Sequence, residues 1–394
     1  MSPRPPPGPA PGVSLVPFGA VWFTYFAAIG LFNPYAPLWF KELGFSTLAI
    51  GTIASLQSWT RVLVPYGWGW LGDRGGQRVR LVRWAAFGAL LCALALLATR
   101  GYAAVALATM LVFAFNGAVV PLSEATLAHH LNTAKGIDPA RYGRVRVWGS
   151  LGFIVAVTAG GALLEWQGIG WFPVLAAGTF GLLWLAALRV PSQRDDVSGR
   201  AEAPPVLTIL RRPLVAWFFA SVFFTVLGHT SLYAFFSLYL DSLGYPKSTV
   251  GVLWAVAVAV EVVFFWYQGR IAARASATRW LQWAAAGSVL RFALIAAFGA
   301  NFWLLVLAQL MHMLTFAAHH AACITLISQQ FPGPLRGRGQ ALYTTLGYGI
   351  PGVIGGVGGG WLGAQFGFAA VFWAAALAGV VAWVCANVAA RRAG

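Results

Sequence analysis

Long apolar segments follow one another along almost the whole chain, and this succession limits the possible folds more than any other feature. Each segment is about 20 residues or longer, the length that an α-helix needs to cross a bilayer. Only 9% of the 394 residues are charged and 59% are hydrophobic, so a soluble domain could not cover its surface with charges. The short alternation typical of a transmembrane β-barrel is missing. The sequence therefore predicts an all-α membrane protein.

Twelve transmembrane helices in two six-helix bundles are predicted from these segments. Their expected ranges are 15–40, 47–71, 80–99, 102–131, 142–164, 170–189, 213–240, 247–270, 278–299, 301–330, 337–363 and 367–390. Residues 1–14 are Pro-rich, are expected to be disordered and lack the apolar core of a signal peptide. The polar linker 190–212 divides an N-terminal bundle (15–189) from a C-terminal bundle (213–394).

The basic residues are distributed unevenly between the two sides. Of the 26 lysines and arginines, 21 lie before the first helix, after even-numbered helices or at the C-terminus, three lie on the other side and two lie inside helices. Because positive loops face the cytoplasm, both termini are predicted to be cytoplasmic. The net charge of +16, placed in this way, favours a lipid bilayer over nucleic acid as the partner. We expect a multi-pass, monomeric protein of a bacterial inner membrane.

An internal repeat supports the division into two related halves. Leu43-Gly44-Phe45 recurs as Leu243-Gly244-Tyr245, and at the same offset of 200 residues Gly51 corresponds to Gly251. Repeats of this kind are common in transporters. The sequence therefore predicts two pseudo-symmetric bundles.

Several ionisable residues are predicted to lie near the bilayer midplane. Counting from the loops places Arg61, Glu261, Arg291 and His312 at this depth. A charge there costs about 2.5–3.5 kcal/mol on insertion scales, so it usually faces a partner or a cavity. The spacing of seven residues places His319 on the same helix face as His312. We expect a functional cluster, although a fixed Glu261–Arg291 pair would also explain these residues.

A second candidate site combines Glu124 and Arg146. Glu124 lies about two turns before the end of the fourth helix, and Arg146 about one turn into the fifth, so the two side chains are expected to meet. Tyr35, Tyr233 and Phe236, on the first and seventh helices, could stack on a substrate ring. They could equally pack the core.

The connection between the second and third helices carries a glycine-rich, charged motif. It reads Gly69-Trp70-Leu71-Gly72-Asp73-Arg74-Gly75-Gly76-Gln77-Arg78. Its glycines allow close approach of helix ends, and its acid can cap a helix or pair with an arginine. The motif resembles the loop signature of the major facilitator superfamily, although Gln77 stands where a basic residue is common. The residues expected to form a conformational-switch loop are Gly69, Gly72, Asp73, Arg74 and Arg78.

Other segments resemble the lactose permease-like branch of this superfamily and are closest to the bacterial 3-phenylpropionic acid transporter group. The resemblance is carried by segments that include 121–125, 142–149 and 311–313. It implies the twelve-helix fold of the superfamily. It also implies that Glu124 and Arg146 bind the substrate. The midplane position of Arg61 and the rings named above predict that these residues contact the substrate as well.

The resemblance further implies a proton-coupling network that contains Arg291 and His312. The permease carries a glutamate three residues after this histidine, whereas this chain has Thr315. Glu261 is the remaining acid within the membrane part of the second half, so we expect it to take over the proton. His319 is expected to modulate this step.

These observations predict a secondary active transporter that works by alternating access. The expected activity is proton symport of a small organic solute, and an aromatic monocarboxylate such as a phenylpropionate-like acid fits the cations and the aromatic residues. The alternatives are a sugar or nucleoside symporter and a non-transporting receptor with the same fold. A membrane enzyme is disfavoured, because no nucleotide loop, nucleophile motif or paired-histidine metal spacing occurs. No cofactor and no metal are expected.

Overall fold

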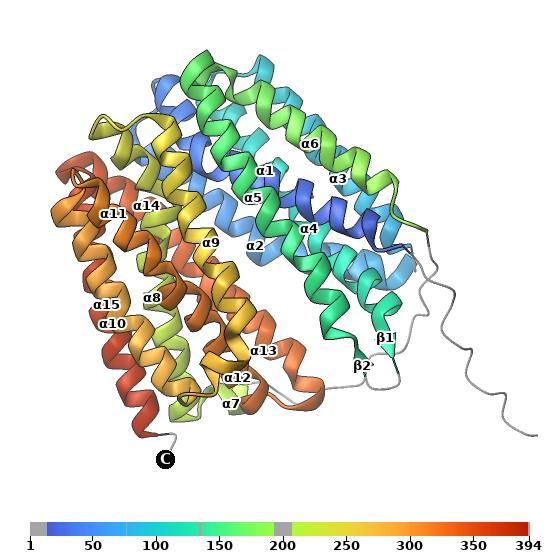
Figure 1. Cartoon of the computed structure of the whole chain (residues 1–394), viewed down its shortest axis with the longest axis vertical. Helices are drawn as coiled ribbons and strands as arrows, with labels where there is room; N and C mark the ends of the chain where they lie inside the picture. The colour runs from blue at the N-terminus through green and yellow to red at the C-terminus, as the bar shows by residue number, and fades with distance from the viewer. Residues whose placement is uncertain (1–13, 76, 134–135, 193–206, 393–394) are drawn as a thin grey trace, which may run out of the picture.

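The structure of the chain is a computed structural model that describes residues 14–75, 77–133, 136–192 and 207–392. The described residues are almost entirely helical, and the helices form two groups (Figure 1). The first group contains α1 (Val16–Glu42), α2 (Thr47–Gly75), α3 (Arg78–Ala98), α4 (Tyr102–Leu131), α5 (Pro139–Gln167), η1 (Ile169–Trp171) and α6 (Phe172–Leu188). After the short α7 (Leu207–Leu210), the second group contains α8 (Pro213–Ser242), α9 (Lys247–Ala272), α10 (Ala277–Phe298), α11 (Phe302–Leu310), η2 (Met313–Ala318), α12 (His319–Gln330), η3 (Gly333–Leu335), α13 (Arg336–Leu342), η4 (Tyr343–Gly349), α14 (Ile350–Phe366) and α15 (Phe368–Arg391).

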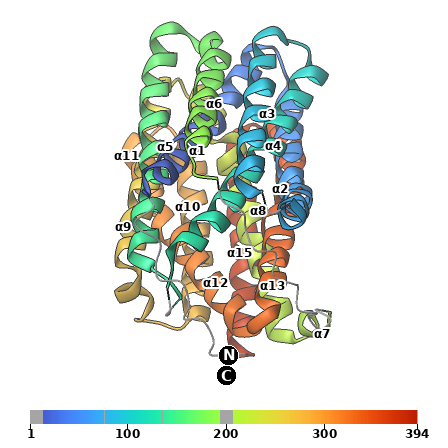
Figure 2. The ribbon, with the colours of Figure 1, turned by 90° about the vertical axis from the view of Figure 1, so that its right-hand side faces the viewer.

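This arrangement confirms the predicted all-α membrane fold with two six-helix bundles. Ten helical segments of the described chain are long and apolar enough to cross a membrane. The other two predicted spans are α2 and the stretch formed by α13, η4 and α14. In Figure 2 the first group lies in front of the second, so the molecule has two layers of helices. The predicted bounds of the two bundles stay predictions, since most of the linker falls outside the described residues.

Exposed apolar side chains cover the outside of both groups. Three tryptophans, Trp166, Trp266 and Trp303, are between 75% and 78% exposed. Large apolar side chains are exposed in this way where lipid replaces water, and tryptophan prefers the membrane interface. The outer surface therefore agrees with a membrane environment.

Three local features differ from the predicted helix pattern. The predicted spans 301–330 and 337–363 each contain a π-helical segment, η2 and η4, so neither is a regular α-helix. The connection between α4 and α5 forms two short antiparallel strands, β1 (Asn132–Thr133) and β2 (Gly136–Ile137). The second helix continues to Gly75, four residues beyond the predicted end. Hydropathy along the sequence does not predict these features, because each depends on the backbone hydrogen bonds of the folded chain.

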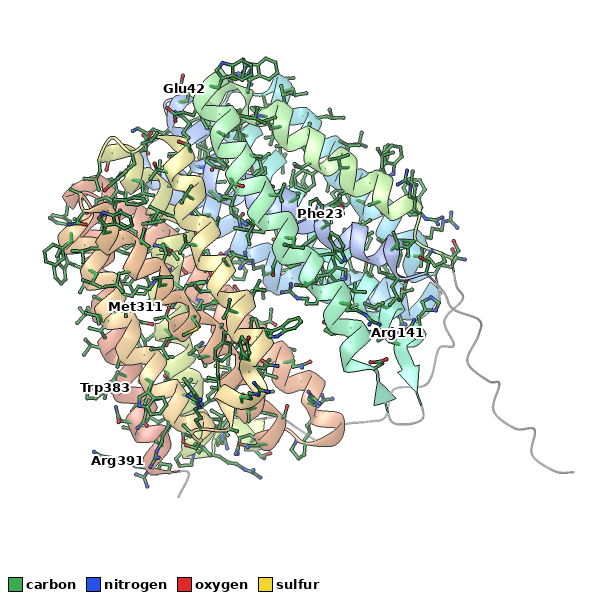
Figure 3. All side chains as sticks on the ribbon, in the orientation of Figure 1. Phe23, Glu42, Arg141, Met311, Trp383 and Arg391 are labelled. Atoms are coloured by element: carbon green, nitrogen blue, oxygen red, sulfur yellow. The ribbon has the colours of Figure 1, made fainter. Side chains whose placement is uncertain are left out.

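The two ends of the molecule differ in charge. One end, here called the arginine-rich end, carries Arg141 and Arg391, and the opposite end carries Glu42 (Figure 3). The two groups of helices converge at the opposite end and spread apart toward the arginine-rich end (Figure 1). At the opposite end, Lys41 Nζ of α1 lies 2.7 Å from Asp241 Oδ2 of α8. Lys41 and Asp241 occupy equivalent positions in the 200-residue repeat.

The repeat is visible in the backbone of this end. Gly44 and Gly244 follow α1 and α8 with φ angles of 82° and 81°, a conformation that strongly favours glycine. Gly51 packs against the backbone of α14 at Gly356, while its counterpart Gly251 packs against the backbone of α5 at Val157. The contacts between the groups therefore follow the same pattern twice, along α2–α14 and along α5–α9.

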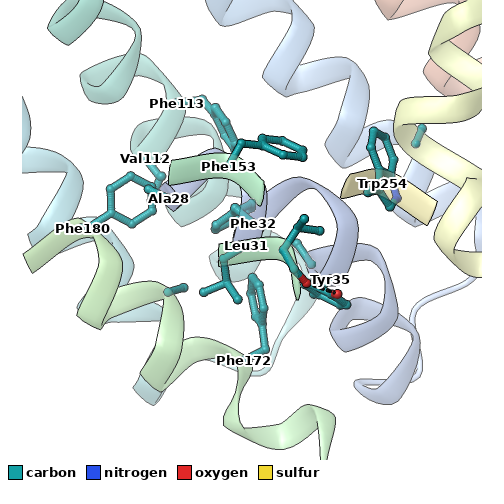
Figure 4. Close-up of a cluster of buried hydrophobic side chains, with 14 of the residues drawn as sticks. Ala28, Leu31, Phe32, Tyr35, Val112, Phe113, Phe153, Phe172, Phe180 and Trp254 are labelled. Atoms are coloured by element: carbon teal, nitrogen blue, oxygen red, sulfur yellow. Dashed lines mark hydrogen bonds between the residues drawn. The ribbon is translucent and has the colours of Figure 1, made fainter. Parts of the chain in front are cut away.

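The core of the first group is aromatic and reaches the interface between the groups. The ring of Phe32 packs edge-on against Phe113, Phe172 and Phe180, with centroid distances of 5.2, 5.3 and 6.4 Å (Figure 4). Edge-on packing of this kind adds about 0.5–1.5 kcal/mol per pair to the burial of the rings. It holds α1 in place and thereby positions the residues of α1 that face the second group.

Candidate functional site

A cavity lies between the two groups of helices and is lined by residues of α1, α2, α4, α8, η4 and α14. The empty space within it, about 730 Å³, includes open solvent. Its polar lining residues are Asn33, Gln57, Ser58, Arg61, Thr109, Thr230, Tyr233 and Tyr348. Among the described lining residues, Arg61 is the one charged side chain. The cavity is therefore suited to a small solute that has a negative or strongly polar group.

The polar lining contains one hydrogen bond between helices and one hydroxyl group without a partner. Gln57 Nε2 donates to Asn33 Oδ1 over 3.1 Å, which joins α2 to α1. The hydroxyl of Thr109 is buried and has no hydrogen-bond partner among the described protein atoms. A buried polar group without a partner is costly and usually binds water or a ligand.

Of the three aromatic residues predicted to bind substrate, one lines the cavity and two lie outside it. Tyr233 lines the cavity, and its ring stacks on Trp254 at 6.0 Å. Tyr35 and Phe236 lie outside the lining. The Tyr35 hydroxyl lies 2.6 Å from Val157 O and 3.3 Å from Lys247 O, where the groups converge (Figure 4). Phe236 packs edge-on against Trp254, so both are placed as packing residues.

A buried polar cluster surrounds Arg291 in the second group. Arg291 is 0% exposed. Its Nη1 donates to His312 Nδ1 at 2.8 Å and to Thr315 Oγ1 at 2.9 Å, and its Nη2 donates to Gln309 Oε1 at 3.0 Å. Glu261 Oε2 lies 3.8 Å from His312 Nε2. The Glu261–Arg291 pair considered from the sequence is therefore wrong, because His312 lies between the two residues.

The hydrogen bonds of this cluster determine the tautomer of His312. A guanidinium can only donate, so His312 Nδ1 must accept. The neutral ring then carries its proton on Nε2, the atom that faces Glu261. The cluster thus forms a line from a fixed cation, through a neutral imidazole N–H, to a carboxyl group.

His229 of α8 extends this cluster and was not expected from the sequence. Its Nδ1 lies 2.8 Å from Thr225 O, and its ring lies 6.4 Å from the ring of His312. Within the described part of the chain, His229 Nε2 and Arg291 Nε are buried without a hydrogen-bond partner. A histidine inside an apolar helix was the signal that could have identified this position.

His312 and His319 do not share one helix face, contrary to the sequence-based prediction. The ring of His312 stacks on Phe316 at 4.8 Å, and the next ring in this ladder is His320, 6.3 Å from Phe316. His319 instead faces Cys323, with Sγ 3.6 Å from Nε2. The π-helical η2 lies between His312 and His319 and adds one residue to the turn. The positions after it are rotated by one residue, so His320 takes the expected place.

Glu124 and Arg146 have other partners than each other. The Tyr142 hydroxyl of α5 donates to Glu124 Oε1 of α4. The guanidinium of Arg146 lies 5.0 Å from the ring centroid of Trp22 and 4.8 Å from that of Phe26, a cation–π arrangement. The expected direct pair is therefore wrong, and neither residue belongs to the cavity lining. Arg146 is nevertheless within electrostatic range of Glu261 in the other group.

The conformational-switch motif forms the end of α2 and the start of α3. Gly69 and Gly72 are helical, and Gly72 packs against Leu122 of α4. Arg78 is the first residue of α3. The side chains of Asp73 and Arg74 lie outside the described residues, so the role predicted for the motif stays a prediction.

The cavity residues that sequence reasoning missed are uncharged. The cavity is also lined by Asn33, Gln57, Thr109 and Tyr348. The sequence analysis estimates depth in the membrane for ionisable residues only, so it does not identify these four. Amides within apolar helices are costly to bury, so Asn33 and Gln57 could have been identified by this signal. A single threonine or tyrosine is too common in such helices to stand out.

Two pseudo-symmetric helix groups with a cavity between them are typical of secondary transporters. The chain belongs to the MFS_1 like family, whose family model matches residues 15–374. It is 30% identical over 335 residues to the probable 3-phenylpropionic acid transporter of Escherichia coli (strain K12), covering 83% of this chain and 86% of that protein. It is also 30% identical over 292 residues to the maltose permease of Geobacillus stearothermophilus, covering 68% and 70%. The chain is thus a transporter of the major facilitator type.

Solved structures agree with this fold. The nucleoside transporter NupG superposes with a TM-score of 0.78 at 17% identity, covering 95% of this chain and 98% of that chain. An inward-facing, occupied bacterial homolog of the human lysosomal transporter Spinster gives a TM-score of 0.71 at 13% identity, covering 96% of each chain. At such identities the likeness concerns the fold alone.

Proposed function

We propose that this transporter couples a proton to the movement of a small aromatic monocarboxylate. The observation that carries the proposal is the charge of the cavity, in which Arg61 is the one charged residue among the described lining. A guanidinium binds a carboxylate with two parallel hydrogen bonds. Tyr233 and Tyr348 supply aromatic surface beside it. The similarity to a protein named as a probable 3-phenylpropionic acid transporter supports the same substrate class.

The proposed proton site is Glu261. Its carboxyl group lies near the Nε2–H of His312, which Arg291 holds in one orientation. As a carboxylate, Glu261 attracts Arg146 of the other helix group, and as a neutral acid it does not. Gain or loss of one proton therefore changes the attraction between the two groups, which is what coupling to alternating access requires.

The proposed orientation places both termini in the cytoplasm of a bacterial cell, with the protein as a monomer in the inner membrane. The arginine-rich end then faces the cytoplasm, in agreement with the positive-inside rule. The opposite end, where Lys41 meets Asp241 and the helix groups converge, faces outward. The structure then corresponds to an inward-facing state.

The experiment is uptake into proteoliposomes that contain the purified protein. 3-Phenylpropionate is expected to accumulate when an inward proton gradient is imposed and to equilibrate without accumulation when the gradient is collapsed. Arg61→Gln is the matched variant, because it removes the charge and keeps a polar side chain. Equal accumulation with and without the gradient would reject proton coupling. Accumulation by Arg61→Gln at the wild-type level would reject the carboxylate site.

A sugar or nucleoside is the second candidate substrate. The amides of Asn33 and Gln57 and the hydroxyls of Ser58 and Thr230 line the same cavity and suit an uncharged, hydroxylated solute. A relative is named as a maltose permease. Maltose and uridine therefore serve as competitors in the uptake assay, and a receptor without transport would take up none of the three solutes. The substrate-binding roles of Glu124, Arg146, Tyr35 and Phe236 stay predictions.

A further inference from the structure

A chain of hydroxyl groups connects the cavity to a histidine that the proposed proton site does not use. Tyr348 lines the cavity, and its Oη lies 3.1 Å from Oη of Tyr343. Tyr343 Oη lies 3.0 Å from His320 Nδ1 on α12. These three residues are here called the tyrosine relay.

Both π-helical segments are needed to assemble the relay. In an α-helix, residues five positions apart point in different directions, about 140° apart. The π-helical η4 spans Tyr343–Gly349, and its wider turn brings Tyr343 and Tyr348 onto one face, where their hydroxyls meet. The other segment, η2, rotates His320 into the ladder of rings behind Phe316. Such segments occur frequently at functional sites, and here each positions one part of the same chain.

We propose that the proton on His320 Nδ1 decides whether Tyr348 donates or accepts a hydrogen bond in the cavity. When Nδ1 carries a proton, it donates to Tyr343, Tyr343 donates to Tyr348, and the Tyr348 hydroxyl is left to donate into the cavity. When Nδ1 is bare, Tyr343 donates to it and accepts from Tyr348, which then offers only lone pairs to a solute. Full protonation of the imidazole allows the first arrangement only.

This polarity couples a proton to the binding of an anion. A carboxylate accepts hydrogen bonds and cannot donate, so it fits beside Arg61 only when Tyr348 donates. The carboxylate therefore favours the proton on His320, and that proton favours the carboxylate, with equal strength in both directions. This step rests on the proposed function, since an uncharged sugar could bind to either arrangement.

The hydrogen bond of His320 goes to Tyr343 and not to Glu261, although Arg146 acts electrostatically on both His320 and Glu261. His319 precedes His320 in sequence, and Arg146 of α5 is the charged group that acts on His320 electrostatically. The thiol of Cys323 also lies within hydrogen-bonding reach of Tyr343. The only ring contacts of His320 that the structure describes are with Phe316 and Tyr343. Glu261 acts on Tyr348 at the other end of the chain.

The first test needs no ligand. Ring nitrogen NMR of histidine-labelled protein follows the titration of His320, whose signal is assigned by its loss in His320→Phe. Tyr343→Phe is expected to lower the midpoint by about one pH unit, because the hydroxyl binds the charged imidazolium more strongly than the neutral ring. Tyr239→Phe is the matched control, because this buried hydroxyl of α8 lies 3.4 Å from Ala296 O of α10, and neither helix carries a relay residue. An unchanged His320 midpoint in Tyr343→Phe would overturn the relay.

The second test measures binding of 3-phenylpropionate to purified protein at pH 6 and at pH 8. Tyr348→Phe is expected to weaken binding about tenfold at pH 6, because it removes the donor directed at the carboxylate. Tyr343→Phe and His320→Phe keep that hydroxyl but cut its link to the His320 proton, so each should show a smaller pH dependence of affinity than the wild type. The double variant Tyr343→Phe/His320→Phe should match either single variant, since one chain can be broken only once. A pH dependence equal to that of the wild type in both single variants would overturn the relay while leaving the proposed substrate intact. A wild-type protein that binds no 3-phenylpropionate would overturn the proposed substrate, and the titration would then decide the relay.

Discussion

Glu165 at the end of α5 caps a helix of the other group. The N–H of Lys247, the first residue of α9, donates to Glu165 Oε2 over 2.6 Å. The N-cap residue of α9 is Pro246, which makes no side-chain cap. The first N–H groups of a helix lack partners within it and carry partial positive charge. The carboxylate therefore stabilises the state in which α5 and α9 meet, and removing it should favour the state that is open at this end.

The magnitude of this effect follows from the kind of contact. A side-chain cap is typically worth about 1 kcal/mol, and the exposure of Glu165 places this one at about 0.5–1 kcal/mol. Glu165→Ala should thus raise the ratio of open to closed molecules about two- to fivefold. Glu165→Gln keeps an oxygen acceptor and should have a smaller effect. Asp241→Asn breaks a pair whose side chains are 52% and 29% exposed, so its effect should be smaller and should disappear in high salt.

The assay measures the distance between two spin labels in a protein without other cysteines. The labels are attached at Ser46→Cys and Ser242→Cys, one in each helix group, at the end where Lys41 meets Asp241. The population of long distances reports the open state. Glu42→Ala is the control, because Glu42 is an exposed acid at the same end without a hydrogen bond or ion pair among the described residues. If Glu165→Ala gives no larger open population than Glu42→Ala, the cap does not stabilise closure and the reasoning is refuted.

Three further predictions concern the cavity and the buried cluster. Arg61→Lys should weaken 3-phenylpropionate binding about tenfold in an equilibrium binding assay, since an ammonium cannot form the bidentate pair; unchanged affinity would contradict the anion site. Glu261→Gln should retain solute exchange in counterflow but lose proton-driven accumulation, because the amide mimics a permanently protonated acid; normal accumulation would move the proton site elsewhere. Thr315→Val should destabilise the protein by about 1–3 kcal/mol, because it leaves a buried N–H of Arg291 without its acceptor; thermal unfolding in detergent that matches the wild type would argue against this hydrogen bond.

The sequence alone was sufficient for the transmembrane architecture. In lipid every backbone polar group must be satisfied within the protein, so a long apolar segment has to be helical wherever it packs. The repeat was readable for a similar reason, because the turn after α1 and the turn after α8 both need a left-handed backbone at Gly44 and Gly244. Depth counting also placed His312 and Arg291 at one level, where the structure joins them by a hydrogen bond.

The tertiary structure decided which side chains meet. Two helical residues at one depth are neighbours only if their helices have the right rotation, and a π-turn changes that rotation by one residue without a hydropathy signal. This is why His320 rather than His319 continues the ring ladder, and why Tyr343 can reach Tyr348. Glu124 likewise binds Tyr142 instead of Arg146, because the guanidinium is held over aromatic rings. Local composition determines that a segment is a helix, whereas the packing of all the helices determines where each side chain points.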